Sequence, residues 1–444
     1  MKNPPPHHLS SALRTPGALA AASRPAAPPL LCRLAAAAAL CAALVLGGCG
    51  AGQAPFSEEA DPPVPVPAPA EPTQPAEPAQ PAEPPSAPTP EELLEQRVDA
   101  TMASMTQEQK VAQLFIVTPE AITGVETATQ AGDTTRAALA SYPVGGLVYF
   151  QKNLLNPEQT AKMLANSQAY AREVVDAPLF CCVDEEGGTV SRIGGNSGFD
   201  VENVGNMADV GATGDQEKAQ STAETIAGYL SQLGFNVDFA PDADVADNPE
   251  SNVMALRSFG ADPSLVASMV AAQVDGFSAK GVLCTAKHFP GIGAAVGDSH
   301  DGSIGSDKNL DQLDEVELVP FKAAIEHDVP FVMVGHLSLP NVTGSDVPAS
   351  LSPDIVTGVL RERLGYQNVI VTDSLGMGAV SAWCAPDQVA VEALLAGADM
   401  VLMPADFQAA YQGALDALAD GRLTQDRIDD SVRRILTMKY ARLD

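Results

Sequence analysis

The sequence predicts an α/β fold, a single-domain (β/α)8 barrel, on two observations. From about residue 92 onward, eight short apolar runs alternate with segments of helical, amphipathic periodicity. The runs are continuously apolar rather than alternating, which is typical of parallel strands that are covered on both faces. Eight such units in about 350 residues fit a closed barrel, and a doubly wound open sheet is the alternative.

The expected elements follow one another along the chain. The predicted strands cover residues 112–117, 146–150, 179–183, 237–240, 281–285, 331–334, 369–372 and 400–403. The amphipathic segments include residues 157–175, 218–233, 263–280, 310–327 and 353–364. In either architecture, functional groups are expected just beyond the carboxyl ends of the strands.

Composition and charge exclude several classes of function. The chain has 444 residues, of which 45% are hydrophobic, and its 56 acidic against 25 basic residues give a formal net charge of −31. A surface this negative repels phosphate backbones, so no nucleic-acid partner is expected. The seven cysteines show no C-x-x-C spacing, which argues against a zinc module or a disulfide scaffold.

The first 48 residues have the order of a signal peptide. They carry Lys2 and three arginines, contain no Asp or Glu, and finish in an apolar run over 34–46 that is too short for a comfortable transmembrane helix. The run ends in Leu46-Gly47-Gly48-Cys49, which resembles a bacterial lipobox. This implies lipidation at Cys49, extracytoplasmic location and membrane contact through the lipid anchor only. An ordinary cleaved signal or an uncleaved anchor is the alternative.

Residues 49–91 are predicted to form a disordered linker. The segment consists largely of Pro, Ala, Glu, Gln, Ser and Thr, which cannot build a core. Proline favours the extended polyproline II conformation, so the segment is expected to act as a semi-rigid spacer. The domain over 92–444 would then be held away from the membrane.

Ionisable residues cluster directly after the predicted strands. They are Asp184, Glu185 and Glu186, then Asp242 and Asp244, Lys287 and His288, His336, and Asp373. Such a ring at one rim predicts an active site in the barrel mouth. Asp373 has two interpretations, a cap of the following helix or a carboxylate nucleophile or base.

A second candidate group lies in a Gly-rich stretch. Asp298 stands two residues before His300, and an Asp close to a His can orient the imidazole and raise its basicity, which makes His300 a candidate general acid/base. The alternative is a surface loop. Arg192 and Arg257 are cations that could orient a substrate. The sequence contains neither H-x-H nor H-E-x-x-H nor an EF-hand spacing, so no metal and no cofactor are expected.

Taken in order, these motifs resemble those of glycoside hydrolase family 3, specifically its single-domain β-N-acetylhexosaminidases. The matching segments are residues 145–153, DEEGGTVSR (184–192), FAPDADV (239–245), RSFG (257–260), KHFPG-x-G (287–293), DSH (298–300), PASLS (348–352) and VTDSLGMGAV (371–380). The resemblance spans the chain from residue 94 to the end. It departs from the family pattern at Ile292, where His is usual, and in the residues that follow His300.

The resemblance implies a retaining exo-β-N-acetylglucosaminidase that releases terminal GlcNAc from peptidoglycan fragments or related glycans. Asp373 resembles the nucleophile, His300 the general acid/base and Asp298 the residue that tunes it. The residues that resemble the GlcNAc-binding set are Asp184, Arg192, Arg257, Lys287 and His288.

Other functions remain open at this point. A phosphorylase is one, because a histidine repels incoming phosphate less than a carboxylate does, and a β-glucosidase-like enzyme is another. Family β-glucosidases usually take their acid/base from a following domain, whereas about forty residues follow the last predicted strand here, so a barrel loop is expected to supply it. A wall-binding lipoprotein with a decayed site is a third, suggested by Ile292. A monomer is expected.

Overall fold

The computed structural model describes residues 87–248, 254–295, 302 and 304–444. Cys49, Asp298 and His300 therefore lie outside the described residues, as do the predicted signal peptide and nearly all of the predicted linker. Helix α1 begins at Pro90, so Pro90 and Glu91, which the sequence assigns to the linker, belong to the folded part.

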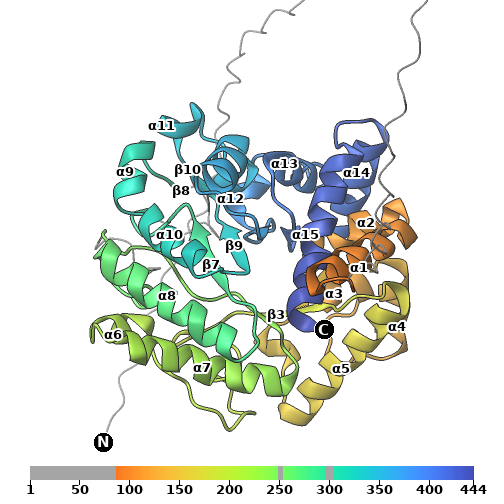
Figure 1. Ribbon diagram of the computed structural model, residues 1–444, viewed down its shortest axis with the longest axis horizontal. Helices are drawn as coiled ribbons and strands as arrows, with labels where there is room; N and C mark the ends of the chain where they lie inside the picture. Colours follow the sequence, from red (N-terminus) through yellow and green to blue (C-terminus); the bar gives the residue numbers. More distant parts are fainter. Residues whose placement is uncertain (1–86, 249–253, 296–301, 303) are drawn as a thin grey trace, which may run out of the picture. The chain divides into compact units, whose positions relative to one another are not determined.

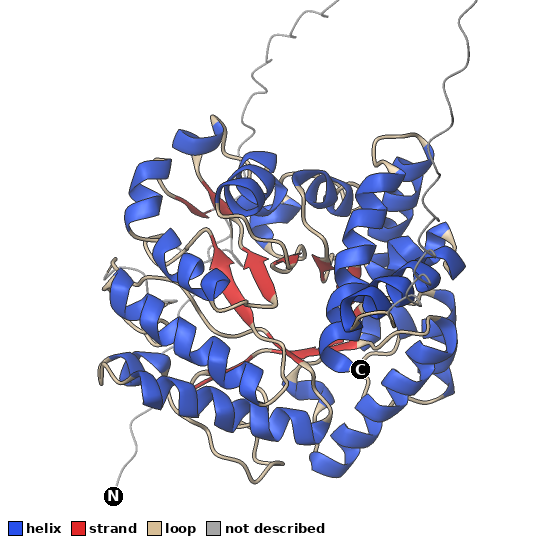
Figure 2. Cartoon of the chain, in the orientation of Figure 1, coloured by secondary structure: helices blue, strands red, loops and turns tan. Residues whose placement is uncertain are grey.

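Eight parallel strands form a closed barrel in chain order. They are β1 (Phe115–Val117), β2 (Gly146–Val148), β3 (Phe180–Val183), β6 (Val237–Asp238), β7 (Thr285–Phe289), β9 (Phe331–Val334), β11 (Val369–Thr372) and β12 (Val401–Leu402). Strands β12-β1-β2-β3-β6 pair in one sheet and β11-β9-β7 in another. Parallel bridges Val237–Leu283 and Val371–Met400 join the two sheets, which closes the ring. The barrel prediction is confirmed and the open sheet is wrong (Figure 2).

Helices surround the barrel (Figure 1). The longer ones are α1 (Pro90–Ser104), α4 (Asp133–Ser141), α5 (Pro157–Val174), α7 (Gln216–Leu233), α8 (Pro263–Ala279), α10 (Leu318–Glu326), η3 (Asp354–Arg363), α13 (Val389–Ala396), α14 (Phe407–Ala419) and α15 (Gln425–Leu443). The shorter ones are α2 (Gln107–Gln113), α3 (Pro119–Thr123), α6 (Met207–Gly211), α9 (Leu310–Glu315), α11 (Pro340–Thr343) and α12 (Gly378–Ser381). Short strands β4 (Glu185–Gly187), β5 (Val190–Ser191), β8 (Ile304–Gly305) and β10 (Leu337–Ser338) lie outside the barrel.

Local sequence explains where the helices begin and end. Helix α7 begins after Asp215, whose carboxylate accepts the backbone N–H groups of Glu217 and Lys218, and it ends at Gly234 with φ +94°, a conformation that favours glycine. The predicted helix over 310–327 is instead two helices, α9 and α10. The break falls at Val316 and Glu317, because Pro320 has no N–H to donate to the Val316 carbonyl and its ring clashes with that carbonyl in a continuous helix, whereas the first turn of α10 accepts it.

The amino-terminal end of the barrel is filled by side chains. Phe180 and Phe331 are the first residues of β3 and β9, and their rings meet edge to face at 5.2 Å between centroids. Both residues are fully buried. Because this end is closed, ligand access is expected from the opposite rim, where the strands end.

The fifth strand corrects the sequence prediction. Residues 281–285 are the predicted strand, whereas β7 covers Thr285–Phe289, and Lys287 and His288 therefore lie in the strand rather than after it. The apolar run before Thr285 includes Leu283, which bridges to Val237 at the entrance of the barrel. The prediction failed because strand residues near a functional mouth are polar, so the apolar run stops before the strand does.

No helix in the part of the chain that the structure describes is long and apolar enough to cross a membrane.

A buried amine near the closed end of the barrel gives a stability prediction. Lys439 in α15 is 1% exposed, and its Nζ donates to Gln113 Oε1 at 2.9 Å and lies 4.8 Å from the centre of the Phe180 ring. Burial lowers the pKa of Lys439 from its ordinary value to about 7. Between about pH 7 and 10 the unfolded state therefore binds more protons than the folded state, and the free energy of unfolding rises with pH. The loss of stability that Lys439 causes is largest below about pH 7.

We expect Lys439→Met to stabilise the protein at pH 6, by on the order of 1 kcal/mol, because it replaces a buried cation by an apolar chain of similar size. The gain should shrink toward pH 10, where the unfolded state also loses its proton. Thermal unfolding of both proteins across this pH range checks it. A difference in Tm that is the same at every pH would contradict it, since the loss of the Gln113 contact alone carries no pH dependence.

Candidate active site

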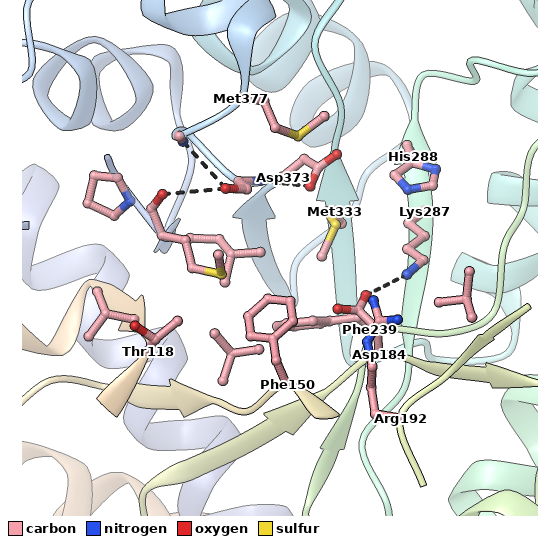
Figure 3. Close-up of a pocket in the computed structure, with 18 of the residues that line it drawn as sticks. Thr118, Phe150, Asp184, Arg192, Phe239, Lys287, His288, Met333, Asp373 and Met377 are labelled. Atoms are coloured by element: carbon pink, nitrogen blue, oxygen red, sulfur yellow. Dashed lines mark hydrogen bonds and ion pairs between the residues drawn. The ribbon is translucent and has the colours of Figure 1, made fainter. Parts of the chain in front are cut away.

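A cavity of about 690 Å³ opens at the carboxyl ends of the barrel strands. Six of the predicted site residues line it, namely Asp184, Arg192, Arg257, Lys287, His288 and Asp373. They come from β7 and from the segments that follow β3, β6 and β11, so residues up to 189 positions apart in the sequence meet here (Figure 3). Asp298 and His300 lie outside the described residues, and their place relative to this cavity stays a prediction.

A buried charge network forms one wall of the cavity. Lys287 Nζ donates to Asp184 Oδ1 at 2.9 Å and lies 2.6 Å from Glu186 Oε1. Arg257 donates to both oxygens of Glu186, each at 2.8 Å. Both Lys287 and Glu186 have only 2% of their side chains exposed. The two cations thus share one carboxylate and hold it against the strand.

The network keeps its members charged. Burial would raise the pKa of Glu186, but Lys287 and Arg257 lower that pKa well below its ordinary range. Burial would likewise lower the pKa of Lys287, and the carboxylates of Asp184 and Glu186 raise it instead. The sequence predicts Glu186 among the ionisable residues at the barrel rim but gives it no individual role. The signal was its position two residues after Asp184, which places both side chains on the same side of an extended chain.

His288 is fixed by a second carboxylate. Its Nδ1 lies 2.7 Å from Asp244 Oδ2, and its Nε2 lies 3.4 Å from Arg257 Nη2. Burial would lower the pKa of His288, but the hydrogen bond to Asp244 raises it above the ordinary value. Burial, the largest cause, and the negative charge of Asp244 together raise the pKa of Asp242 to about 7. The site therefore contains a histidine biased toward the cation and a carboxyl group close to its titration point at neutral pH.

One group in the described residues has the composition of a metal site. Asp242, Asp244 and His288 offer ligand atoms that all lie within 4.8 Å of one another. The guanidinium of Arg257 already lies between two of them, with Nη2 3.5 Å from Asp242 Oδ2 and 3.4 Å from His288 Nε2. A metal ion would have to displace this cation, so the donor set fits an arginine better. The absence of a metal stays a prediction.

Asp373 follows β11 and faces the cavity. Its backbone N–H donates to Val334 O at 2.8 Å, and its Oδ1 accepts the N–H of Ser374 at 2.7 Å. The next helix, α12, begins only at Gly378 with Met377 as its N-cap, so the helix-cap interpretation of Asp373 is wrong. Burial would raise the pKa of Asp373, but the charges of His336 and His288 lower it below its ordinary value. The group is an ionised carboxylate at neutral pH.

Asp373 and the charge network occupy different sides of the cavity. In the close-up, Asp373 lies beside Met333 and Met377, whereas Asp184, Arg192 and Lys287 lie across from it near Phe239 and Phe150 (Figure 3). A ligand in this space would therefore meet the carboxylate on one side and hydrogen-bonding groups on the other.

The Arg192 side chain has a hydrogen-bond donor that is not used within the described residues. Its guanidinium carbon lies 5.8 Å from the centre of the Phe150 ring, and its buried Nε has no hydrogen-bond partner among the residues that the structure describes. A buried donor without a protein partner costs free energy, which a polar ligand in the cavity could recover. This arrangement fits a ligand-binding role.

His336 is a site residue that the sequence pointed to without a role. It follows β9 and is buried, its Nδ1 lies 2.8 Å from Ser350 Oγ, and its Nε2 lies 2.9 Å from the carbonyl oxygen of Ser374. The carbonyl can only accept, so Nε2 carries the proton. The ring thus supports the residue that follows Asp373.

A (β/α)8 barrel with an ionised carboxylate and cationic groups at its mouth has the architecture of a barrel enzyme. Residues 106–438 match the model of the "Glycosyl hydrolase family 3 N terminal domain", and the chain belongs to this family. The predicted family resemblance is confirmed.

Named relatives support the same family. The chain is 35% identical over 325 residues to Beta-hexosaminidase A of Pseudoalteromonas piscicida, covering 68% of this chain and 54% of that protein. It is 34% identical over 349 residues to Beta-hexosaminidase LpqI of Mycobacterium tuberculosis, covering 76% of this chain and 84% of that protein. The chain thus spans about half of the first relative and most of the second.

Solved structures support the same family assignment. A family 3 β-N-acetylglucosaminidase from Paenibacillus superimposes with a TM-score of 0.71 at 39% identity, covering 76% of this chain and 63% of that one. A structure of the beta-glucoside phosphorylase BglX gives a TM-score of 0.70 at 26% identity, covering 79% and 62%. Both similarities extend over more than three quarters of this chain.

The ionisation of Asp373 gives a pH prediction. We expect His336→Gln to move the acidic limb of the kcat/KM profile to higher pH, because removal of a nearby positive charge lets Asp373 take up a proton more readily. A pH series of kcat/KM on an aryl glycoside checks it. The matched control is His327→Gln, a histidine paired with Asp275 outside the cavity lining, which should leave the limb in place. An unchanged acidic limb in His336→Gln would contradict the electrostatic role.

Proposed function

We propose that the protein is a retaining exo-β-N-acetylglucosaminidase that removes a terminal, non-reducing, β-linked GlcNAc. The observation that carries the proposal is the placement of the ionised Asp373 across the cavity from the hydrogen-bonding wall of Asp184, Arg192 and Lys287. The names of the relatives, beta-hexosaminidase and β-N-acetylglucosaminidase, support the choice of sugar.

The reaction would proceed in two displacements. In the first, Asp373 attacks the anomeric carbon and forms a glycosyl ester, while His300 donates a proton to the departing glycosidic oxygen. In the second, water attacks the same carbon, His300 takes the proton from the water, and Asp373 leaves as a carboxylate. Asp298 would orient His300 and adjust its basicity. No metal takes part in either step.

The opposite wall would bind the sugar. Asp184 can accept from sugar hydroxyls, and Lys287 and Arg192 can donate to them, because Arg192 has unused donors and Lys287 already faces the cavity. His288 and Arg257 would fix this wall and contact the sugar from the side of β7. Phe150, Phe239 and Met333 supply apolar surface for the carbon face of the ring.

The location and the natural substrate belong to the proposal as well. A lipid at Cys49 and the spacer over 49–91 would hold the barrel outside the membrane, where peptidoglycan fragments and other GlcNAc glycans are available. We propose that the barrel acts as a monomer.

The contacts of Ile292 do not support the alternative function of a wall-binding lipoprotein with a decayed site. Its backbone N–H donates to Asp244 Oδ1 at 2.6 Å, and this contact fixes the carboxylate that holds His288. A backbone contact survives the replacement of the usual His side chain by Ile.

The second candidate function, a phosphorylase, is favoured by the similarity to BglX. Product analysis in phosphate buffer would distinguish GlcNAc-1-phosphate from free GlcNAc.

We expect Asp373→Ala to abolish release of the aryl group from an aryl β-GlcNAc, with a loss of at least about a thousandfold in kcat, because the covalent step disappears. The measurement is steady-state turnover of the full protein, with an aryl β-glucoside as the control for sugar preference. Circular dichroism verifies that the variant is folded. Substantial turnover by the variant would contradict the nucleophile assignment.

We expect His300→Ala to slow a GlcNAc disaccharide by about a hundredfold or more and an aryl β-GlcNAc much less, since an aryl leaving group needs little protonation. Parallel kcat/KM values for the two substrates check it. Equal losses on both substrates would count against His300 as the acid.

A further inference from the structure

We propose that Glu185 is a positioning residue that sets the place of Arg192 in the cavity without touching the substrate. The proposal rests on the proposed function, in which Arg192 binds the terminal sugar. Glu185 is fully buried and does not line the cavity, whereas its neighbours Asp184 and Glu186 both do. Because successive side chains of an extended strand point to opposite sides, Glu185 faces away from the ligand.

Five donors converge on this one carboxylate. Its Oε2 accepts the backbone N–H groups of Arg192 at 2.6 Å and Ile193 at 2.9 Å. Its Oε1 accepts the backbone N–H of Gly194 at 2.8 Å, together with the hydroxyls of Ser191 at 2.5 Å and Tyr229 at 2.9 Å. Three successive amides directed at one anion form a concave binding arrangement, here occupied by a side chain of the same chain.

The contacts fix the segment that carries Arg192. Strands β4 and β5 pair antiparallel, with Glu185 opposite Ser191, and the chain then turns around the carboxylate through residues 192–194. A Cβ at Gly194 would lie 3.2 Å from Glu185 Oε1, so the turn approaches the carboxylate closely. The position of the Arg192 Cα is therefore determined by the reach of the Glu185 side chain.

Nothing else in the described residues holds the Arg192 side chain by a hydrogen bond. Its Nε is buried without a partner, and the Phe150 ring lies 5.8 Å from the guanidinium carbon. Asp184, Glu186 and Lys287, by contrast, hold one another through ion pairs. Arg192 thus depends on its backbone for its place, and the backbone depends on Glu185.

Glu185 is in turn tied to the barrel. Its own N–H donates to Asp238 Oδ1 of β6 at 2.9 Å, and Tyr229 reaches it from α7. Burial and the nearby Glu185 raise the pKa of Tyr229, so its hydroxyl keeps the proton that it donates. The carboxylate is therefore a junction between the wall of the barrel, α7 and the turn at Arg192.

Two conservative variants distinguish the effect of the length of the Glu185 side chain from the effect of its charge. Glu185→Gln keeps the length of the side chain, and its amide oxygen can accept from Arg192 and Ile193 while its NH2 donates to the Ser191 and Tyr229 hydroxyls, which can act as acceptors. The Gly194 N–H loses its acceptor and faces the amide NH2, while the other four contacts can be kept. Glu185→Asp keeps the charge but shortens the side chain by one methylene, so the three amides must either lose their acceptor or move toward it.

The experiment is a double-mutant cycle on the full protein, with Glu185→Asp, Glu185→Gln, Arg192→Ala and the two corresponding double variants. The readouts are kcat and KM for an aryl β-GlcNAc and the Tm of each variant. We expect Glu185→Asp to lower kcat/KM by about tenfold or more, chiefly through KM, and Glu185→Gln to stay within about threefold of the unmodified protein. In the Arg192→Ala background, Glu185→Asp should add less than about a threefold loss.

A merely structural role would give a different result. If Glu185→Asp lowers kcat/KM by the same factor with and without Arg192, or if it leaves KM unchanged, the positioning role is overturned. A crystal structure of Glu185→Asp supplies a readout that does not depend on turnover. Displacement of the Arg192 guanidinium in an otherwise unchanged barrel supports the proposal, and an unmoved Arg192 overturns it. Failure of the unmodified protein to hydrolyse aryl β-GlcNAc would instead reject the proposed function.

Discussion

The buried ion pair between Lys287 and Glu186 is the interaction on which the rest of the site depends. It joins β7 to the segment after β3, and Arg257 and Asp184 extend it to either side. Removing one member of such a pair leaves a charge without compensation in the interior, at a cost of about 3–5 kcal/mol. The barrel mouth therefore accepts this polar wall only as a complete set, in which each cation meets a carboxylate.

The same cationic surroundings decide how the carboxyl groups behave. Glu186 and Asp373 have lowered pKa values because positive groups lie near them, whereas burial beside Asp244 raises the pKa of Asp242 to about 7. Carboxyl groups in and around one cavity thus differ in protonation. Asp184 and Glu186 also line the cavity but are ion-paired with Lys287, whereas Asp373 lies on the opposite side, which suits it to attack a sugar.

The residues around the cavity fall into those that meet a ligand and those that hold them. Asp184, Arg192 and Asp373 line the open space. Asp244 holds His288, His336 supports Ser374, and Glu185 supports the turn at Arg192. Each supporting residue is almost fully buried and shares several hydrogen bonds. This division explains how short loops at a barrel rim present side chains in fixed positions.

The sequence by itself determined the number and order of the barrel strands, because continuous apolar runs mark strands that are buried on both faces, as at residues 331–334 and 369–372. It also determined that ionisable groups follow those strands and that the chain belongs to glycosyl hydrolase family 3. It placed Lys287 and His288 outside the strand that contains them, since hydrophobicity does not mark strand residues at a polar mouth. Only the tertiary structure decided that Glu186 pairs with two cations, that Glu185 turns away from the cavity, and which carboxyl groups are ionised. These properties depend on distances between residues far apart in the chain, and local sequence carries no information about such distances.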